Sequence, residues 1–477
     1  MCRSFAVPLF VAIAYACNLH MNSPDDTIAA LGTAPGEGGI SVVRVSGPGT
    51  FAIADRVFRC AGAKPSSRPG GTFVTGHTQD AQGDVDEALL LIMRGPRSYT
   101  REDMVEIQGH GGNEAARRNL RLVLEAGARL AEPGEFTKRA FLSGRLDLLQ
   151  AEAVLDLIRA RSDRAASAAL EQLEGHLSDR FNELYDVTVA LLADLEASLD
   201  FPEDELPEGV LDGLNSRLGK LAARFEALRA TWDEGHLLRE GAQVVIIGRP
   251  NAGKSSLLNA LLGKDRAIVS ETPGTTRDTI EEGFSVGGVP LRLVDTAGMR
   301  EALCDVEREG IRRTQRQVEA ADLYLLVVDA SQPANPEDLE TLASLRREHC
   351  IVVLNKTDLG QGAKPKAFSG TAAVETCLLT GAGVQPLREA MADLLRREGH
   401  LSTEPRAVIS ERHHRVITEA KIFLEDAIGL LSEGHEDQIV IAASKIRDAL
   451  EQLGTVTGRV YHDELLDSIF SRFCIGK

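Results

Sequence analysis

Eight consecutive residues, Gly248–Ser255, have the composition of a phosphate-binding loop. They read Gly-Arg-Pro-Asn-Ala-Gly-Lys-Ser and directly follow the apolar run Val244–Ile247. Glycines let such a loop wrap around phosphates, so that backbone amides and a helix N-terminus face the negative charge. In this motif the lysine reaches the β- and γ-phosphates and the serine hydroxyl is a ligand of Mg²⁺. The residues expected to contact nucleotide are therefore Asn251, Ala252, Gly253, Lys254, Ser255 and Ser256.

Two further segments have the order expected of a nucleotide-dependent switch. Thr275-Thr276 comes first, and Asp295-Thr296-Ala297-Gly298 follows the apolar run Leu291–Val294. Thr276 is the candidate second protein ligand of Mg²⁺, and it would contact only the γ-phosphate state. Asp295 would approach the metal, and the Gly298 amide would sense the γ-phosphate.

The base specificity is predicted by Asn355-Lys356-Thr357-Asp358, which follows the apolar run Ile351–Leu354. A carboxylate at Asp358 can accept hydrogen bonds from N1–H and the 2-amino group of guanine, and adenine lacks that amino group. Asn355 and Lys356 complete this part of the site. The four ordered segments together predict that the chain binds GTP.

Two positions depart from the usual pattern of a GTPase. Met299 follows Gly298, where many GTPases have the Gln that orients the attacking water. A thioether cannot polarise water, so another group must do so. Cys377-Leu378 occupies the turn whose backbone amides usually bind guanine O6, where Ser-Ala is expected, and this difference predicts looser nucleotide binding.

The elements that must position these residues follow from the sequence pattern. Apolar strands alternate with helical stretches from about 240 to 395, which is typical of a parallel α/β sheet. Residues 25–140 mix short β-like runs, such as Ile40–Val45, Ala88–Met93 and Met104–Ile107, with Gly/Pro turns, which indicates an α+β domain.

The remaining segments have the periodicity of a helix bundle. Leu170, Leu177, Leu184 and Leu191 recur every seven residues, and Leu211–Trp232 has apolar residues at spacings of three and four. Helical periodicity returns from about 410 to 453, so the helices before and after the α/β segment should pack together around an inserted domain. The predicted division is 21–140 (α+β), 141–238 and 399–477 (helical), and 239–398 (P-loop GTPase).

Composition limits the possible functions. The chain has 477 residues, a formal net charge of −18, 43% apolar and 26% charged residues. This acidity argues against non-specific nucleic-acid binding, which needs a basic surface, although a local basic pocket for one RNA is compatible with it. The seven cysteines have no metal-ligand spacing and suit a reducing cytoplasm.

The first twenty residues resemble a secretory signal, with Arg3 before the apolar run Ala6–Ala16. That run is too short for a membrane-spanning helix. A GTP-dependent protein finds no nucleotide outside the cell, and Met21 provides a second start. We therefore expect 1–20 to be a mis-assigned or disordered extension of a cytoplasmic protein that has no membrane association.

Several motifs resemble the MnmE (TrmE) family of tRNA-modification GTPases, within the TrmE-Era-EngA-like GTPases. The similarity runs from about Asp26 to Lys477. The motifs that carry it are Asn251 in the phosphate loop, Gly274–Asp278, Asp295–Glu301, Gly109–Gly112, Pro133–Thr137, Leu146–Leu148 with Gln150–Ala153, Leu238–Gly241 and the terminal Phe473–Lys477.

The resemblance implies an N-terminal folate-binding domain, a helical domain and an inserted G domain in a homodimer. It also implies a heterotetramer with an FAD-dependent partner subunit, the FAD being held only by that partner. Such a complex adds an aminomethyl or carboxymethylaminomethyl group to C5 of the wobble uridine (position 34) of certain tRNAs. The carbon donor would be 5-formyl- or 5,10-methylene-tetrahydrofolate.

The resemblance also implies how the missing Gln is replaced. The family is activated by K⁺, which Asn251, Ser270, Thr272 and Thr275 would coordinate. A cation there can stabilise developing charge as an arginine finger does. The catalytic residues carried over by position are Glu307, expected to orient water, together with Arg277 and Cys474.

For folate, the matching positions are Arg44, Glu106, Arg145 and the terminal Lys477. The family often has Lys at the position of Arg145, and the two cations differ in geometry. A carboxylate such as Glu106 suits the amino-pyrimidine edge of a pterin. The resemblance places the tail with Cys474 near the folate, and the sequence leaves open whether Cys474 is a nucleophile.

One other function remains open at this point. The chain could be an RNA-binding or ribosome-assembly switch GTPase without modification chemistry, but such a protein is expected to carry a basic RNA-binding domain.

His413-His414 is expected to give polarity to a helix surface or to contact RNA rather than to bind metal, because adjacent helical residues point apart.

Overall fold

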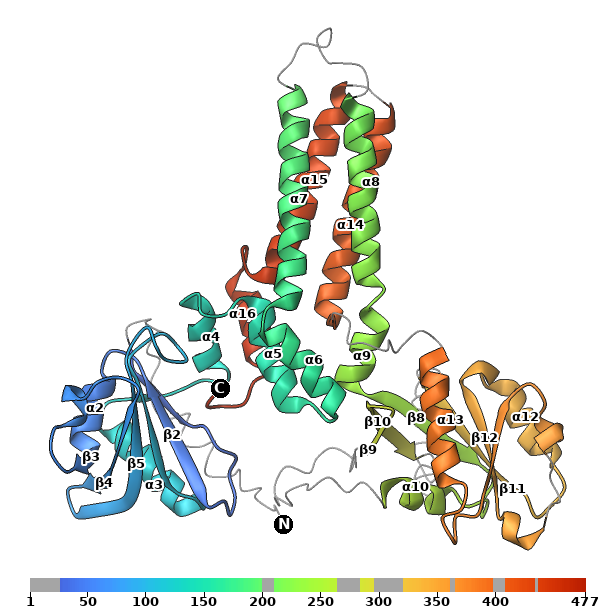
Figure 1. Ribbon diagram of the computed structural model, residues 1–477, viewed down its shortest axis with the longest axis horizontal. Coiled ribbons are helices and arrows are strands. Elements are labelled where there is room, and N and C mark those ends of the chain that lie inside the picture. Colours follow the sequence, from blue (N-terminus) through green and yellow to red (C-terminus); the bar gives the residue numbers. More distant parts are fainter. Residues whose placement is uncertain are drawn as a thin grey trace, which may run out of the picture. The chain divides into compact units, whose positions relative to one another are not determined.

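The computed structural model describes residues 26–199, 210–263, 284–295, 321–360, 365–397, 408–433 and 436–477. The chain forms two compact units (Figure 1). One unit extends to Leu146 and also contains Asp463–Lys477, and the other contains Asp147–His462. The end of the chain therefore belongs to the same compact unit as the N-terminal sheet.

The N-terminal unit is built on a seven-stranded sheet with strand order β3-β4-β5-β6-β2-β1-β7. β1 and β7 are parallel, and the other neighbours are antiparallel. The three β-like runs predicted from sequence lie within β2, β5 and β6. The strands are β1 Ile28–Leu31, β2 Ile40–Ser46, β3 Phe58–Cys60, β4 Thr72–Asp80, β5 Gly83–Met93, β6 Met104–His110 and β7 Arg129–Leu130.

Alternation along the strands separates a core face from a face that carries polar side chains. Val43 and Val45 are buried against helices α2 (Thr50–Val57) and α3 (Asn113–Glu125). Because successive strand residues point to opposite faces, the intervening Arg44 lies on the other face. Helices α4 (Glu135–Leu142) and α16 (Asp463–Phe470) pack together in the same unit.

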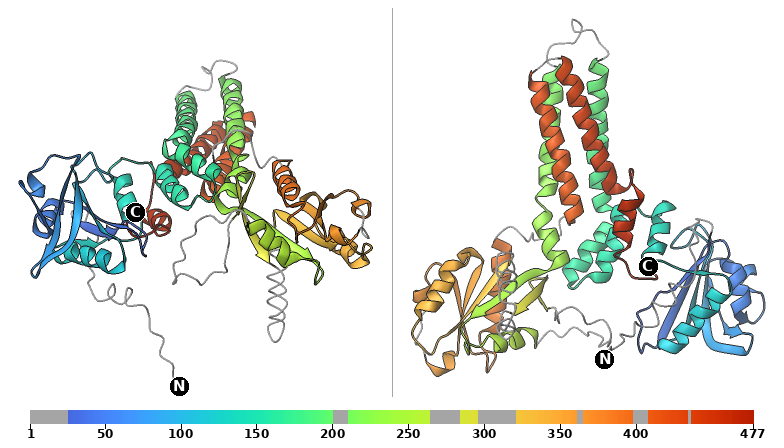
Figure 2. Two further views of the ribbon diagram at one scale, coloured as in Figure 1. Left: turned by 60° about the horizontal axis from the view of Figure 1, so that its bottom comes forward. Right: turned by 180° about the vertical axis from the view of Figure 1, so that it is seen from behind.

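The second unit contains a bundle of four long helices, which run side by side in both views (Figures 1 and 2). They are α7 (His176–Leu199), α8 (Val210–Arg229), α14 (Glu411–Glu433) and α15 (Glu436–Thr457). One apolar core joins side chains from both sides of the α/β segment, for example Phe181, Phe225 and Ile446. The expectation that these helices pack together is confirmed.

The seven-residue leucine repeat does not form one continuous stripe. Leu177, Leu184 and Leu191 are buried in the bundle, but Leu170 is 47% exposed. Leu170 belongs to a separate helix, α6 (Asp163–Leu173), and the chain turns at Gly175 with a φ of 102° before α7 begins. Helices α5 (Leu148–Arg159) and α9 (Trp232–Glu240) belong to the same unit.

The α/β part of this unit has a six-stranded sheet with strand order β13-β12-β11-β8-β10-β9. All neighbours are parallel except β9 and β10. The sheet is covered on both faces, so its central strands are almost entirely apolar. The elements are β8 Ala242–Gly248, α10 Lys254–Leu262, β9 Phe284–Val286, β10 Val289–Asp295, β11 Leu323–Asp329, α12 Pro336–Ser344, β12 Cys350–Asn355, β13 Ala372–Thr376 and α13 Val384–Arg397. The predicted fold class is confirmed.

Candidate functional site

The phosphate loop joins the central strand β8 to helix α10. Its last glycine, Gly253, is the N-cap of α10 with a φ of 110°, a conformation that residues with a Cβ rarely adopt. Lys254 donates hydrogen bonds of 2.9 Å from Nζ to the carbonyl oxygens of Gly248 and Arg249. The side chains of Ser255 and Ser256 are exposed in the first turn of α10, where hydroxyl and backbone amides can meet a phosphate.

The base-reading segment is tied directly to this loop. Asn355 ends β12 and is 4% exposed. Its Nδ2 donates to the carbonyl oxygen of Ala252 over 2.9 Å, and its Oδ1 accepts from the Leu378 backbone amide over 3.2 Å. A Cβ on Gly253 would lie 2.2 Å from Asn355 Nδ2, so only glycine fits between the loop and this amide. Asn355 therefore acts as the link between three segments of the site.

Lys356 and Asp358 follow at the same edge of the sheet. Lys356 has a φ of 66°, and its Nζ donates to Asp329 Oδ2, at the end of β11, over 2.6 Å. Partial burial favours the neutral form of Asp329, but the hydrogen bonds from Lys356 and Ser331, together with the charge of Lys356, outweigh it and hold the pKa of Asp329 below its usual range. The side chain of Asp358 is exposed, where it can meet a guanine base.

The turn with the unusual Cys377-Leu378 pair keeps its backbone hydrogen bonds. The Cys377 amide donates to Ala382 over 2.9 Å, and the Leu378 amide donates to Asn355. Cys377 is 6% exposed, whereas Leu379, which follows the Cys377-Leu378 pair, is 90% exposed. Backbone amides rather than side chains are the groups that this turn supplies, so the substitution is compatible with the geometry of the site.

Several predicted residues of the switch lie outside the described residues. They are Ser270, Thr272, Thr275, Thr276, Arg277, Gly298 and Glu307. Met299 and the extension 1–20 also lie outside the described residues. Asp295 ends β10, next to β8, but its side chain is also outside the described part. The structure thus describes the phosphate loop and the base-reading segments of the site.

A second group of polar residues lies on the N-terminal unit. Arg44 on β2 and Glu106 on β6 are directly paired in register. Arg44 Nε donates to Glu106 Oε1 over 2.9 Å, and both side chains are mostly buried. Among the described residues, Glu106 Oε2 has no hydrogen-bond donor, so this oxygen can accept from a ligand.

The C-terminal tail lies on this ion pair. Arg44 Nη1 donates to the carbonyl oxygen of Gly476 over 3.1 Å, and Ile475 forms an antiparallel bridge with Pro133. Gly476 has a φ of 97°, and a Cβ there would lie 2.3 Å from the Leu31 carbonyl oxygen. Burial, together with the charge of Arg44, lowers the pKa of Lys477. The Cys474 side chain is exposed.

Tyr99 belongs to this site although the sequence analysis did not select it. The Arg44 guanidinium carbon lies 5.6 Å and that of Arg145 4.6 Å from the centre of its ring. Arg145 Nη1 also donates to the Tyr99 carbonyl oxygen over 3.0 Å. A tyrosine between two polar loop residues carries no signal in one sequence. The structure therefore brings together Arg44, Glu106, Arg145 and the tail, and adds Tyr99.

The expectation for His413 was wrong. His413 is completely buried, and its Nε2 lies 2.9 Å from Glu152 Oε2 on α5. Its Nδ1 accepts from the Ser410 backbone amide over 3.1 Å, so the ring proton is on Nε2 in the neutral form. Burial lowers the pKa of His413 to about 4. His414 is half-buried and stacks on Trp232, with ring centres 5.1 Å apart.

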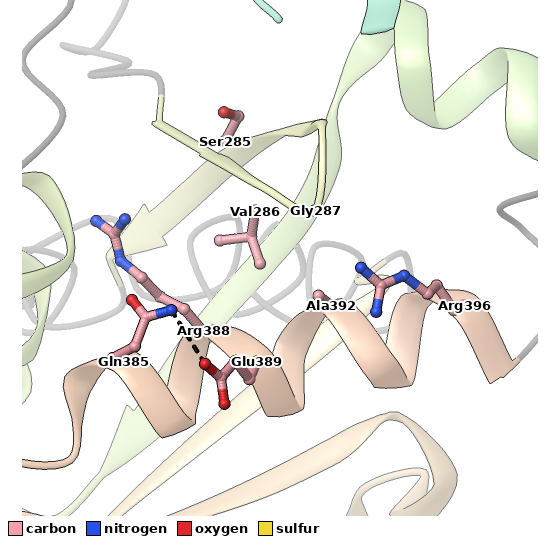
Figure 3. A pocket seen from close by; sticks show the side chains of 8 residues that line it. All are labelled: Ser285, Val286, Gly287, Gln385, Arg388, Glu389, Ala392 and Arg396. Carbon is pink, nitrogen blue, oxygen red and sulfur yellow. Dashed lines mark hydrogen bonds between the residues drawn. The ribbon is translucent and has the colours of Figure 1, made fainter. Parts of the chain in front are cut away.

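A hollow lies beside the β9–β10 hairpin in the α/β part. Figure 3 shows that side chains of α13 line it beneath the hairpin. Arg388 donates from Nη2 to the Leu261 carbonyl oxygen over 2.7 Å, and its guanidinium carbon lies 5.9 Å from the centre of the Phe284 ring. Because these contacts join α13 to α10 and β9, the hollow is part of the packing around the nucleotide site. The residues drawn are Ser285, Val286, Gly287, Gln385, Arg388, Glu389, Ala392 and Arg396.

Two features are absent from the described residues. Within these ranges no helix combines the length and apolar character that crossing a membrane requires. The same ranges contain no group of three or more His, Cys, Asp or Glu side chains placed to hold a metal ion.

Comparisons with known proteins match both units. Residues 27–145 match the model of the GTP-binding protein TrmE N-terminus, and 148–474 match the model of the MnmE helical domain. The tRNA modification GTPase MnmE of Syntrophotalea carbinolica is 45% identical over 95% of this chain and 99% of its own length. That of Moorella thermoacetica is 46% identical over 95% and 100%.

A part of the chain is also similar to the G domain of the FeoB iron transporter of T. maritima. The identity is 27%, the match covers 32% of this chain and 98% of that one, and the TM-score is 0.24. The full-length matches, rather than this one, decide the assignment: the chain belongs to the MnmE family of tRNA modification GTPases.

Proposed function

We propose that this protein hydrolyses GTP to drive modification of tRNA. The product would carry a carboxymethylaminomethyl or aminomethyl group at C5 of the wobble uridine of certain tRNAs. The full-length similarity to MnmE proteins supports the activity class. The observation that carries the modification chemistry is the contact between the Arg44–Glu106 pair and the Gly476 carbonyl oxygen, which builds the tail into a polar site.

In the nucleotide site, the residues divide into those that hold phosphate and those that select guanine. Backbone amides at the start of α10 and Lys254 would bind phosphate, while Ser255 and Thr276 would hold Mg²⁺ with Asp295 nearby. Asp358 would accept hydrogen bonds from guanine. Asn355 positions both halves because it bonds to Ala252 and Leu378.

Hydrolysis in this proposal depends on K⁺ and on Glu307. Asn251, whose φ is 62°, is exposed in the phosphate loop and would be one K⁺ ligand, with Ser270, Thr272 and Thr275 as the others. Bound K⁺ supplies positive charge near the phosphates. Glu307 would orient water and Arg277 would assist.

Turnover of GTP should be faster in K⁺ than in Na⁺ at matched ionic strength, and equal slow rates would refute the cation dependence. Glu307→Ala should reduce hydrolysis with nucleotide affinity nearly unchanged.

The polar site of the N-terminal unit would bind the folate. Glu106 Oε2 is available for the amino-pyrimidine edge, and Tyr99 adds an aromatic ring near the Arg44 and Arg145 guanidinium groups, next to which a pterin would bind. Arg145 and Lys477 suit the glutamate tail by charge. The 5-formyl- or 5,10-methylene-tetrahydrofolate would supply one carbon, and Cys474 is exposed beside this site.

The proposed assembly is a cytoplasmic homodimer that works with an FAD-dependent subunit, as a heterotetramer. The alternative function, an RNA-binding or ribosome-assembly switch without modification, gives no reason for a tail built onto Arg44. Nucleoside analysis of tRNA from a strain that lacks this protein separates the two functions. The proposal predicts loss of the C5 substituent from the wobble uridine, and an unchanged nucleoside profile would refute it.

A further inference from the structure

Helix α5 forms ion pairs near both places where the chain crosses between the helical bundle and the α/β part of its unit. The chain enters the α/β part through α9, which ends at Glu240 just before β8, and returns through α14, which begins at Glu411. Near each crossing a basic residue pairs with a carboxylate of α5. Arg239 pairs with Asp156 over 2.5 Å, and Arg412 Nε donates to Glu152 Oε1 over 2.7 Å.

These ion pairs are shielded from water and are connected to neighbouring helices. The Arg412 and Glu152 side chains are 15% and 14% exposed, and those of Arg239 and Asp156 are 16% and 24% exposed. Arg412 also donates to the carbonyl oxygens of Thr455 and Val456 at the end of α15. Because Glu152 and Asp156 are four residues apart, they lie on one face of α5. A movement of either α9 or α14 would therefore act on the same face of α5.

The next helix contacts the hairpin that joins the two switch motifs. β9 and β10 follow Thr276 in the chain, β10 ends at Asp295, and Gly287-Gly288 forms the turn between the two strands. Ser162, the N-cap of α6, donates from Oγ to the Gly288 carbonyl oxygen over 2.7 Å and accepts from the Ala165 amide. The α5–α6 pair thus contacts the α/β part at its entry, at its exit and at this hairpin.

The start of α5 adjoins the proposed folate site in sequence. Only Leu146 and Asp147 separate Arg145 from Leu148, the first residue of α5. Asp147 forms a capping box with Gln150, with bonds of 2.8 and 3.0 Å, so the first turn of α5 is well fixed. In the other unit, the Arg145 and Leu146 amides both donate to the Ala140 carbonyl oxygen.

We propose that α5 couples the nucleotide site to the folate site, with Glu152 and Asp156 as the positioning residues that transmit the nucleotide state. This inference rests on the proposed function, because coupling to modification requires that the protein modifies tRNA. The described contacts of both carboxylates are with Arg239, Arg412 and His413 and not with the phosphate loop, so removing either charge should spare GTP hydrolysis and interrupt transmission. Coupling of this kind requires an element whose position both sites influence.

The fluorescence of Trp232 can report on the contact between α9 and α14. It is the only tryptophan of the chain, it begins α9, and its ring lies 5.2 Å from the His236 ring and 5.1 Å from the His414 ring. A relative movement of α9 and α14 would change this stacking and therefore the fluorescence of Trp232. Wild-type protein should change its fluorescence between GDP and a non-hydrolysable GTP analogue with K⁺ present.

The test compares Glu152→Gln and Asp156→Asn with two controls. Asp194→Asn removes an exposed ion pair with Arg217 on the same bundle and should behave as wild type. Asp156→Glu restores the charge and should restore function at least partly. For the two test variants we expect GTP turnover within about twofold of wild type, loss of the nucleotide-dependent fluorescence change, and at least tenfold less wobble-uridine modification.

Each outcome decides the inference. Normal fluorescence change and normal modification in both test variants would overturn it. If wild type changes its fluorescence but modifies no tRNA, the proposed function fails, and the fluorescence of the variants still decides whether α5 transmits the nucleotide state. If melting curves show that the test variants are unfolded, Ser162→Ala takes their place, because it removes only the bond to Gly288 and one N-cap contact. Unchanged fluorescence response in that variant would likewise contradict the inference.

Discussion

Asn355 donates its side-chain amide to the carbonyl oxygen of Ala252 over 2.9 Å. This bond joins the base-reading motif to the phosphate loop, although 103 positions separate the two residues. It explains why a buried amide, rather than a carboxylate, starts the Asn355–Asp358 motif. The side chain must donate to one backbone segment and accept from another, and both groups are within reach only where β8 and β12 end on the same edge of the sheet.

Asn355→Ala should therefore weaken binding of both GTP and GDP. The change leaves the Ala252 carbonyl oxygen and the Leu378 amide without their partner, and each lost bond to a buried group costs about 1–3 kcal/mol. We expect nucleotide affinity to fall by about two orders of magnitude, measured by fluorescent-nucleotide titration. Thr341→Ala, which removes an exposed hydrogen bond to the Glu337 carbonyl oxygen within α12, is the control and should not alter affinity. Equal affinities for both variants would show that Asn355 does not organise the site.

Gly476→Ala should separate the two activities of the protein. A Cβ at this position would lie 2.3 Å from the Leu31 carbonyl oxygen, in a backbone conformation that disfavours alanine. The tail should leave Arg44, so tRNA modification is expected to fall at least tenfold while GTP turnover stays near that of wild type. Gly429→Ala is the matched control, since nothing lies within 4 Å of a Cβ there. Full modification by Gly476→Ala would contradict the role of the docked tail.

The buried His413 predicts a loss of stability in mild acid. Burial keeps His413 neutral down to a pKa of about 4, whereas an unfolded histidine titrates near 6.5. The unfolded chain thus binds a proton that the folded chain excludes. The stabilisation is complete above pH 6.5 and is lost as the pH falls toward about 4, by up to about 3 kcal/mol.

Thermal melting of wild type and His413→Gln between pH 7.5 and 4.5 tests this prediction. The variant should show a smaller decrease in Tm over this range, because one titrating group is removed. His462→Gln, an exposed histidine, should keep the wild-type pH dependence. If His413→Gln and wild type lose stability in parallel, His413 is protonated in the folded protein and its assigned neutral state is wrong.

The described cysteines should differ strongly in reactivity. Burial raises the pKa of Cys350 to about 12, and this side chain is fully enclosed in the α/β core. Cys474 is exposed on the tail. Iodoacetamide at pH 7.5 should label Cys474 within minutes and Cys350 only after unfolding, as followed by peptide mass spectrometry. Added tetrahydrofolate should slow labelling of Cys474 if the folate binds beside the tail; equal labelling of both thiols would contradict the structure.

Much of the nucleotide site could be predicted from sequence because its chemistry is local. A phosphate loop needs glycines, a lysine and a serine at fixed spacing, and strands that are buried on both faces appear as apolar runs such as Val244–Ile247. The α+β and helical parts were also predicted, since strand alternation and helical periodicity come from core packing. The position of Leu170 was not, because the helix break at Gly175 depends on tertiary structure.

The contacts between buried polar residues could not be predicted from sequence because the partner residues are far apart in the chain. His413 lies 261 positions from Glu152, and nothing in a His-His pair on a helix indicates which residue is buried. Arg44 and Glu106 were selected only through a family resemblance, and Tyr99 not at all, since a single tyrosine in a polar loop has no local signature. Three-dimensional pairing, rather than residue type, distinguishes these residues from ordinary surface charges.

The central claim is that GTP binding and hydrolysis drive wobble-uridine modification. It is tested most directly in cells whose only copy of this protein carries Lys254→Ala, which removes the lysine of the phosphate loop and leaves the N-terminal unit unchanged. Mass spectrometry of tRNA nucleosides should show wobble uridine without its C5 substituent, as in cells lacking the protein, while the wild-type copy restores it. Full modification with the Lys254→Ala protein, present at wild-type abundance, would contradict the account.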